Sequence, residues 1–139
     1  MSARKGLRIR CDQGINPAIR TSCLNFGMWL REKMDFPVRV VVYLKKTNTV
    51  KNMTTKENVS ATFFAPYDKN VEPYIKVATG DYEDLVHEYG EVDALYIIIE
   101  SIAHEIIHYK QWLSDLDFNE SEAEKEGEKL VDQFADSLD

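Results

Sequence analysis

Two histidines separated by four positions, His104 and His108, and a glutamate directly after the first, Glu105, have the clearest chemical potential in this chain. On an α-helix this separation puts both imidazoles on one face, about one turn apart. Two imidazoles so placed can bind one zinc ion, which lowers the pKa of its bound water towards 7 and polarises a carbonyl group. Glu105 can take a proton from that water, so the spacing predicts metal-assisted hydrolysis.

This chemistry requires that the segment be helical, and its apolar residues have helical spacing. Between positions 94 and 113 they recur at intervals of three and four, as Leu95, Ile98, Ile99, Ile102, Ala103, Ile106 and Leu113. The alternative is a buried helix whose two histidines are satisfied by hydrogen bonds and hold no metal. The helical context favours the metal site.

A third metal ligand is needed, because catalytic zinc sites usually have three protein ligands and an open position. No histidine lies near Ser114, where an extended motif would place one, and His87 lies upstream on a separate predicted helix. His87 is therefore a minor candidate, and a carboxylate is preferred. The C-terminal segment offers Glu120, Glu122, Glu124, Glu126 and Glu128. Helical spacing alone does not choose among them, and most of them fit a solvated acidic face.

Three helices are predicted in the C-terminal half of the chain. A short helix begins at Asp81, an N-cap residue, and ends at Gly90. A long helix runs from about 92 to 113 and a final one from about 120 to 138. The apolar stripe of the last helix consists of Ala123, Gly127, Leu130, Val131, Phe134 and Leu138.

The N-terminal half predicts one helix followed by a small sheet. Asn16 and Pro17 are typical of a helix start, and the helix should end near Met34. Three strands are expected: 38–44, which is buried on both faces, 59–65 and 74–79. The last two are joined by a turn at 66–70 and should be antiparallel, whereas 45–58 is a long surface loop. The fold class is therefore α+β.

Length and composition bound the remaining choices. The 139 residues suit one domain, 1–139, with residues 1–14 as a loose arm or an edge strand. A net charge of −7 disfavours nucleic acid as a partner. No apolar stretch is long enough for a membrane span, and no export signal is evident. We therefore expect a cytoplasmic protein in which Cys11 and Cys23 are reduced thiols.

At the residues of its histidine motif the chain resembles gluzincins, metallopeptidases in which a glutamate on the following helix is the third zinc ligand. In that group the glutamate is often followed by alanine and, four residues on, by an acid that steadies a ligand histidine. The pair Glu122-Ala123 with Glu126 matches this pattern. The resemblance implies Glu122 as the third ligand, Glu126 as a partner of a histidine and Glu124 as the reserve ligand.

The resemblance covers about residues 37 to 138, and the short length is similar to that of minigluzincins and of small intracellular peptidases that cleave repressors. It implies a zincin-like fold that holds one zinc ion and cleaves peptides. It also implies an edge strand along the cleft, for which 74–79 is the candidate. No tyrosine can be carried over as the group that stabilises the oxyanion: Tyr109 points about 100° away from the ligands, and Tyr82 and Tyr96 are unassigned. Tyr109 and Trp112 could line the cleft, although packing against the last helix is preferred for Trp112.

The sequence therefore predicts a zinc metallopeptidase in which His104, His108 and Glu122 hold the metal and Glu105 is the general base. The alternative is a latent or non-proteolytic zinc-binding module that acts through a protein partner. A pocket blocked by the chain's own loop or tail would favour this alternative. A metal-free scaffold is the third hypothesis, and it predicts that the two histidines are packed apart or bonded to carbonyl groups.

Overall fold

The computed structural model describes residues 4–138. Within this range the fold is mixed α+β, as predicted. The helices and strands in chain order are β1 (Leu7–Cys11), α1 (Pro17–Lys33), β2 (Val40–Lys45), β3 (Val50–Lys51), β4 (Asn58–Val59), β5 (Ala61–Phe64), β6 (Tyr74–Ala78), α2 (Tyr82–Tyr89), α3 (Glu91–Leu113) and α4 (Glu120–Ser137).

The main sheet has the strand order β1-β2-β6-β5. β1 and β6 are both parallel to β2, whereas β5 is antiparallel to β6. The predicted antiparallel pair around the turn at 66–70 is thus confirmed, with Phe63 opposite Ile75. Its place in the sheet differs from the prediction, because β6 lies inside the sheet and β5 forms the edge.

β2 is central in the sheet, as its β-branched sequence predicted. Val40, Val42 and Leu44 are fully buried beneath the helices. On the opposite face Val41 is also buried, but Tyr43 is only half-buried. The prediction of burial on both faces was therefore right for the inner face and only partly right for the outer one.

The N-terminal segment forms a strand and not a loose arm. Leu7 and Ile9 of β1 pair with Val40 and Val42 of β2, and the strand closes one edge of the sheet. Residues 1–3 lie outside the described range.

The expected surface loop at 45–58 also contains some strand structure. β3 pairs with β4 in a short antiparallel ribbon, in which Val50 lies opposite Val59. The side chain of Asn52 accepts hydrogen bonds from the backbone N–H groups of Thr54 and Thr55 and so closes the connecting turn.

The helix boundaries follow the predicted capping signals closely. The side chain of Asn16 accepts a hydrogen bond from the N–H of Ala18, and Pro17 is the first residue of α1. Gly90 has a φ of 89° and separates α2 from α3. Asp81 occupies the N-cap position of α2, but its side chain makes no capping hydrogen bond.

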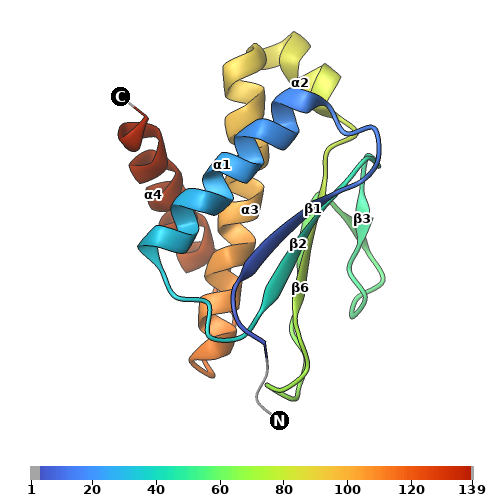
Figure 1. Ribbon diagram of the computed structural model, residues 1–139. Helices are drawn as coiled ribbons and strands as arrows, with labels where there is room; N and C mark the ends of the chain where they lie inside the picture. Colours follow the sequence, from blue (N-terminus) through green and yellow to red (C-terminus); the bar gives the residue numbers. More distant parts are fainter. Residues whose placement is uncertain (1–3, 139) are drawn as a thin grey trace.

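The helices gather on one side of the main sheet (Figure 1). α1 packs against β1 and α3, and α4 lies along α3. One cluster of buried residues runs between these layers, and α3 contributes Ile98, Ile102 and Ile106 to it. α3 is therefore held on several sides, which makes it a rigid support for side chains that project from its free face.

Both cysteines are free thiols, as expected; Cys11 is half-buried and Cys23 is buried. No helix within residues 4–138 combines the length and the apolar character needed to cross a membrane.

Candidate metal centre

Two imidazoles on the face of α3 turned towards β5 form the base of the candidate site. The ring centroids of His104 and His108 lie 5.0 Å apart, as expected for residues one helical turn apart. Together with Glu105, they form a group whose possible ligand atoms all lie within 4.8 Å of one another. The structure thus brings together the three residues of the predicted motif.

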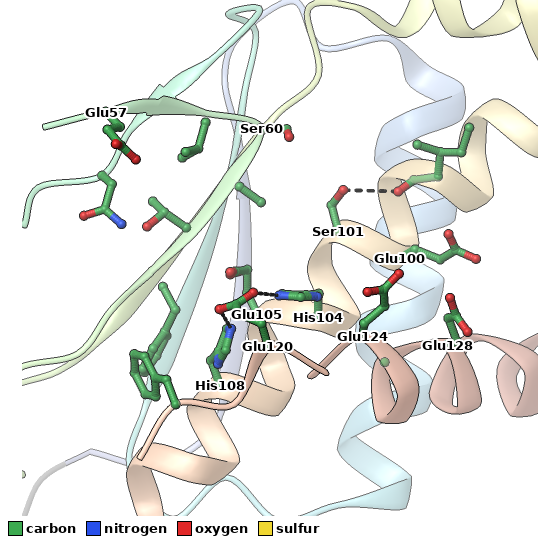
Figure 2. Close-up of a pocket in the computed structure, with 18 residues that line it drawn as sticks. Glu57, Ser60, Glu100, Ser101, His104, Glu105, His108, Glu120, Glu124 and Glu128 are labelled. Atoms are coloured by element: carbon green, nitrogen blue, oxygen red, sulfur yellow. Dashed lines mark hydrogen bonds and ion pairs between the residues drawn. The ribbon is translucent and has the colours of Figure 1, made fainter. Parts of the chain in front are cut away.

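A carboxylate from the first turn of α4 faces both imidazoles (Figure 2). Glu120 Oε2 lies 3.0 Å from His104 Nε2, and Glu120 Oε1 lies 2.7 Å from His108 Nε2. The side chain of Glu120 is 76% exposed, so these contacts are made at the mouth of the site. In position, Glu120 is the third candidate ligand.

Glu122, which the family pattern favoured, does not reach the histidines. Its Oε1 accepts a hydrogen bond of 3.0 Å from Gln111 Nε2, which turns it away from the imidazoles. The reserve residue Glu124 lines the same pocket as the histidines, without a contact to them like that of Glu120. The helical geometry explains the difference: Glu120 lies seven residues before Gly127 and so shares its face, whereas Glu122 is rotated by about 200° from Glu120.

The predicted partner of a ligand histidine, Glu126, is also in the wrong place for that role. It is exposed on α4 and lies 3.7 Å from Lys129 in a surface ion pair. The residue that steadies His108 is Gln111, whose Oε1 lies 2.8 Å from His108 Nδ1. Sequence reasoning missed Gln111, although its position three residues after His108 on the same helix face was a usable signal.

The amide of Gln111 is held in one orientation by its neighbours. Its Oε1 accepts from the N–H of Asn119, and its Nε2 donates to the carbonyl of Asn119 and to Glu122. Exchanging the amide oxygen and nitrogen would turn donor against donor and acceptor against acceptor. Gln111 is 2% exposed, so this arrangement is shielded from water.

This orientation determines which nitrogen of His108 carries the proton. Because Gln111 Oε1 can only accept, His108 Nδ1 must donate. In the neutral imidazole the lone pair is then on Nε2, the atom that faces Glu120. A lone pair next to a carboxylate is repulsive unless a proton or a metal cation lies between them. The arrangement therefore suits a bound cation at this point.

Glu105 supplies a buried carboxylate beside the histidines. It is 6% exposed, and its Oε2 has no hydrogen-bond partner among the described residues. Burial raises the pKa of Glu105 to about 8, and the nearby charge of Glu120 contributes to the rise. A carboxylate with an unused oxygen and a raised pKa is suited to accept a proton from a reacting group.

The close approach of α4 to α3 depends on a glycine. A Cβ atom at Gly127 would lie 3.1 Å from the backbone nitrogen of His104 and 3.3 Å from its Cα. A larger residue would therefore require the backbone around His104 to move by a few tenths of an ångström. Since α4 also carries Glu120, the contact at Gly127 sets how near this carboxylate comes to the imidazoles.

An aromatic residue between α3 and α4 covers His108, the more buried of the two histidines. The ring centroid of Phe118 lies 4.8 Å from that of His108 and 6.0 Å from that of Phe63 on β5. With this cover His108 is only 3% exposed. Phe118 thereby limits access of water to one side of the site.

The site opens into a pocket of about 730 Å³ between α3, α4 and the edge strand. Ala61, Thr62 and Phe63 of β5 form one wall, so the strand along this pocket is β5 and not the predicted 74–79. The free edge of β5 lies where an extended chain could add to the sheet.

None of the tyrosines considered above lines the pocket. Tyr109 is fully buried, so it does not line the cleft, and its hydroxyl donates to the carbonyl of Val38. Trp112 does not line the pocket either. As expected it packs inside, but its partners are Phe63 and the carbonyl of Pro66, to which its Nε1 donates at 2.9 Å.

The other candidates from the sequence lie away from the site. His87 is exposed on α2, Tyr82 is buried, and Tyr96 is half-buried. None of the three lines the pocket. No residue that stabilises an oxyanion is therefore assigned.

Comparison with protein-family models, with curated proteins and with solved structures finds no match for this chain.

Proposed function

We propose that this chain is a zinc-dependent peptidase with a zincin-like fold. The observation that carries the proposal is the convergence of His104, His108 and Glu120 beside the unpartnered, buried Oε2 of Glu105. Two imidazoles and one carboxylate are a ligand set that catalytic zinc favours. A zinc ion bound there would act as a Lewis acid on the carbonyl of a peptide bond.

Two features of the arrangement fit this metal. Two imidazole nitrogens and a carboxylate already meet at one point, and the hydrogen bond to Gln111 leaves Nε2 of a neutral His108 as an acceptor. Ligand histidines are commonly held in this way, with the second ring nitrogen donating to a fixed acceptor. Glu120 replaces Glu122 as the proposed third ligand.

Glu105 is the proposed general base. Its Oε2 would accept a proton from the attacking water, whose oxygen forms a bond to the carbonyl carbon of the peptide. The protonated carboxyl would then deliver the proton to the leaving nitrogen as the carbon–nitrogen bond breaks. The buried position of Glu105 keeps this oxygen free of competing hydrogen bonds within the described chain.

The free edge of β5 indicates where a peptide substrate would bind. β5 pairs with β6 on one side only, and its residues line the pocket opposite the histidines. An extended peptide paired with β5 would pass over the metal centre. An open pocket of about 730 Å³ supports the peptidase over the latent module, which would require a site blocked by the chain itself.

Metal content and activity test the proposal separately. The purified chain should retain about one zinc ion after dialysis, and His108→Ala should abolish retention. Glu105→Gln should retain zinc but lose the cleavage of an unfolded polypeptide, and a chelator should suppress the wild-type activity reversibly. A wild-type chain that binds no zinc would refute the proposal.

The third ligand is tested by a matched pair on one helix. Glu120→Gln should weaken zinc binding by about tenfold or more, because the amide is a much poorer ligand. Glu122→Gln should have a smaller effect, since Glu122 contacts only Gln111 among these groups. The opposite ranking would restore Glu122 as the ligand.

A further inference from the structure

Beyond the metal centre, all the acidic residues that line the pocket are glutamates. Glu100 of α3 and Glu124 and Glu128 of α4 form a helical wall, and Glu57 lies on the strand side (Figure 2). With Glu105 and Glu120 the lining contains six glutamates, and no lysine or arginine of residues 4–138 belongs to it. The helical side of the pocket is therefore rich in acidic groups.

The acids of the helical wall are not neutralised by the protein. Among the described residues, none of Glu100, Glu124 and Glu128 takes part in a salt bridge. Burial raises the pKa of Glu100, and the charges of Glu128 and Asp132 add to the rise. Uncompensated carboxylates side by side repel one another, so a cation brought to this wall gains free energy from all of them.

The carboxylates of the helical wall come from two helices and do not surround one point of a single helix. Glu100 lies one turn before His104 on α3, and Glu124 and Glu128 lie one turn apart on α4. The acids of the wall are therefore spread along the two helices. Such a distribution suits the long side chain of a lysine or an arginine better than one coordinated ion.

A separate observation shows that the pocket is built to receive a ligand. Glu105 lines the pocket, and only 6% of its surface is exposed. Its Oε2 has no hydrogen-bond partner among the described residues. A buried carboxylate oxygen without a donor is costly to the fold and is expected to be satisfied by a molecule that enters the pocket. The acids of the helical wall line the same pocket as this oxygen.

We propose that the pocket selects extended peptide segments that carry a basic side chain, which lies against Glu100, Glu124 and Glu128. The inference depends on the proposed function for the position of the cleaved bond. Glu100 precedes His104 by one turn, which is about 5.4 Å along the helix. Since an extended peptide advances about 3.3 Å per residue, the basic side chain lies within about three residues of the cleaved bond.

Binding is measured first, with the Glu105→Gln chain so that no turnover occurs. Three fluorescein-labelled dodecapeptides are compared by anisotropy, in which alanine alternates with lysine, glutamine or glutamate. We expect the lysine peptide to bind at least about tenfold more tightly than the glutamine peptide at low salt. The advantage should shrink as the salt concentration rises.

A triple variant tests the wall itself. Glu100→Gln, Glu124→Gln and Glu128→Gln together should remove most of the preference for the lysine peptide. A matched control removes the same number of charges from exposed positions outside the pocket, with Glu83→Gln, Glu88→Gln and Glu126→Gln. The control should keep the preference, which separates the pocket from the net charge of the chain.

Cleavage is measured second, with the wild-type chain and a complex mixture of peptides analysed by mass spectrometry. Lysine or arginine should be enriched at one position within about three residues of the cleaved bond. Cleavage without that enrichment, or equal binding of the lysine and glutamine peptides, overturns the inference and leaves the proposed function standing. Tight binding of the lysine peptide without any zinc-dependent cleavage overturns the proposed function and supports the basic ligand.

Discussion

The hydrogen-bond network around Gln111 leads to a prediction that does not depend on catalysis. Gln111 holds the proton of His108 on Nδ1 through a bond of 2.8 Å, and it also joins Asn119 and Glu122. Gln111→Leu preserves the approximate shape of the side chain but removes all four bonds. The substitution should therefore release His108 and weaken both the fold and the metal site.

The magnitude follows from burial. His108 is 3% exposed, so its Nδ1 would lose its partner in a place that water does not reach, at a cost of about 1–3 kcal/mol. The groups of Asn119 and Glu122 are nearer to solvent and together should cost about 1 kcal/mol. We expect a loss of about 2–4 kcal/mol in the free energy of unfolding, measured with urea. Zinc affinity should fall by about 10- to 100-fold, measured by competition with a chromophoric chelator.

Exchanging the amide and the carboxylate between positions 111 and 122 provides the control for the loss of the hydrogen bonds. Gln111→Glu keeps an oxygen opposite His108 Nδ1 but places a carboxylate against Glu122, so it should destabilise the protein at neutral pH. Adding Glu122→Gln restores a donor opposite the new carboxylate and should recover about 1 kcal/mol or more, as a non-additive effect.

The tautomer of His108 gives the decisive measurement. In the wild-type chain without metal, long-range nitrogen–proton NMR correlations should show the proton on Nδ1 of any neutral fraction. In Gln111→Leu both tautomers should be populated. If the variant still shows the single Nδ1 tautomer and binds zinc within about twofold of wild type, the argument that Gln111 orients the ligand is refuted.

Three further predictions concern the frame around the site. Gly127→Ala should lower the free energy of unfolding by about 1–3 kcal/mol, because the new methyl group overpacks against the backbone of His104 and this outweighs a gain in helix propensity of about 1 kcal/mol. The substitution should also weaken zinc binding, and an unchanged urea midpoint would contradict the prediction. Burial raises the pKa of Tyr109 from 10.0 to about 12, so the folded state favours the protonated phenol and the free energy of unfolding should fall as the pH rises through this interval. In Tyr109→Phe, which loses the hydrogen bond to Val38, the free energy of unfolding should fall less steeply with alkaline pH. Parallel curves for the two proteins would argue against this cause. Burial raises the pKa of Cys23 to about 12, so its thiol should not react with a disulfide reagent at pH 8 until urea unfolds the chain. Rapid reaction in the native protein would contradict this and show that this part of the core opens readily.

Sequence periodicity was sufficient for the helices, for three strands of the main sheet and for half of the site. The apolar spacing predicted α3, and the four-residue separation placed His104 and His108 on one face of it. Capping residues such as Asn16 predicted where α1 begins. These features are local, because each depends on a few neighbouring residues and on the geometry of one helix.

The order of strands could not be obtained in the same way. β5 and β6 were both predicted, but which of them lies at the edge depends on the parallel pairing of β6 with β2, whose residues are about 30 positions away in the sequence. The same long-range pairing places β5, and not β6, along the pocket. The strand beside the pocket was therefore predicted wrongly although both strands were recognised.

The motif from His104 to His108 was determined by the sequence alone, since one helical turn fixes the relation between the two imidazoles. The carboxylate that meets them was decided by the tertiary structure. Five glutamates alternate along the start of α4, and the crossing of two helices at Gly127 turns Glu120 towards the imidazoles and Glu122 towards Gln111. A local pattern cannot specify that choice, because it depends on how closely two separate helices approach each other.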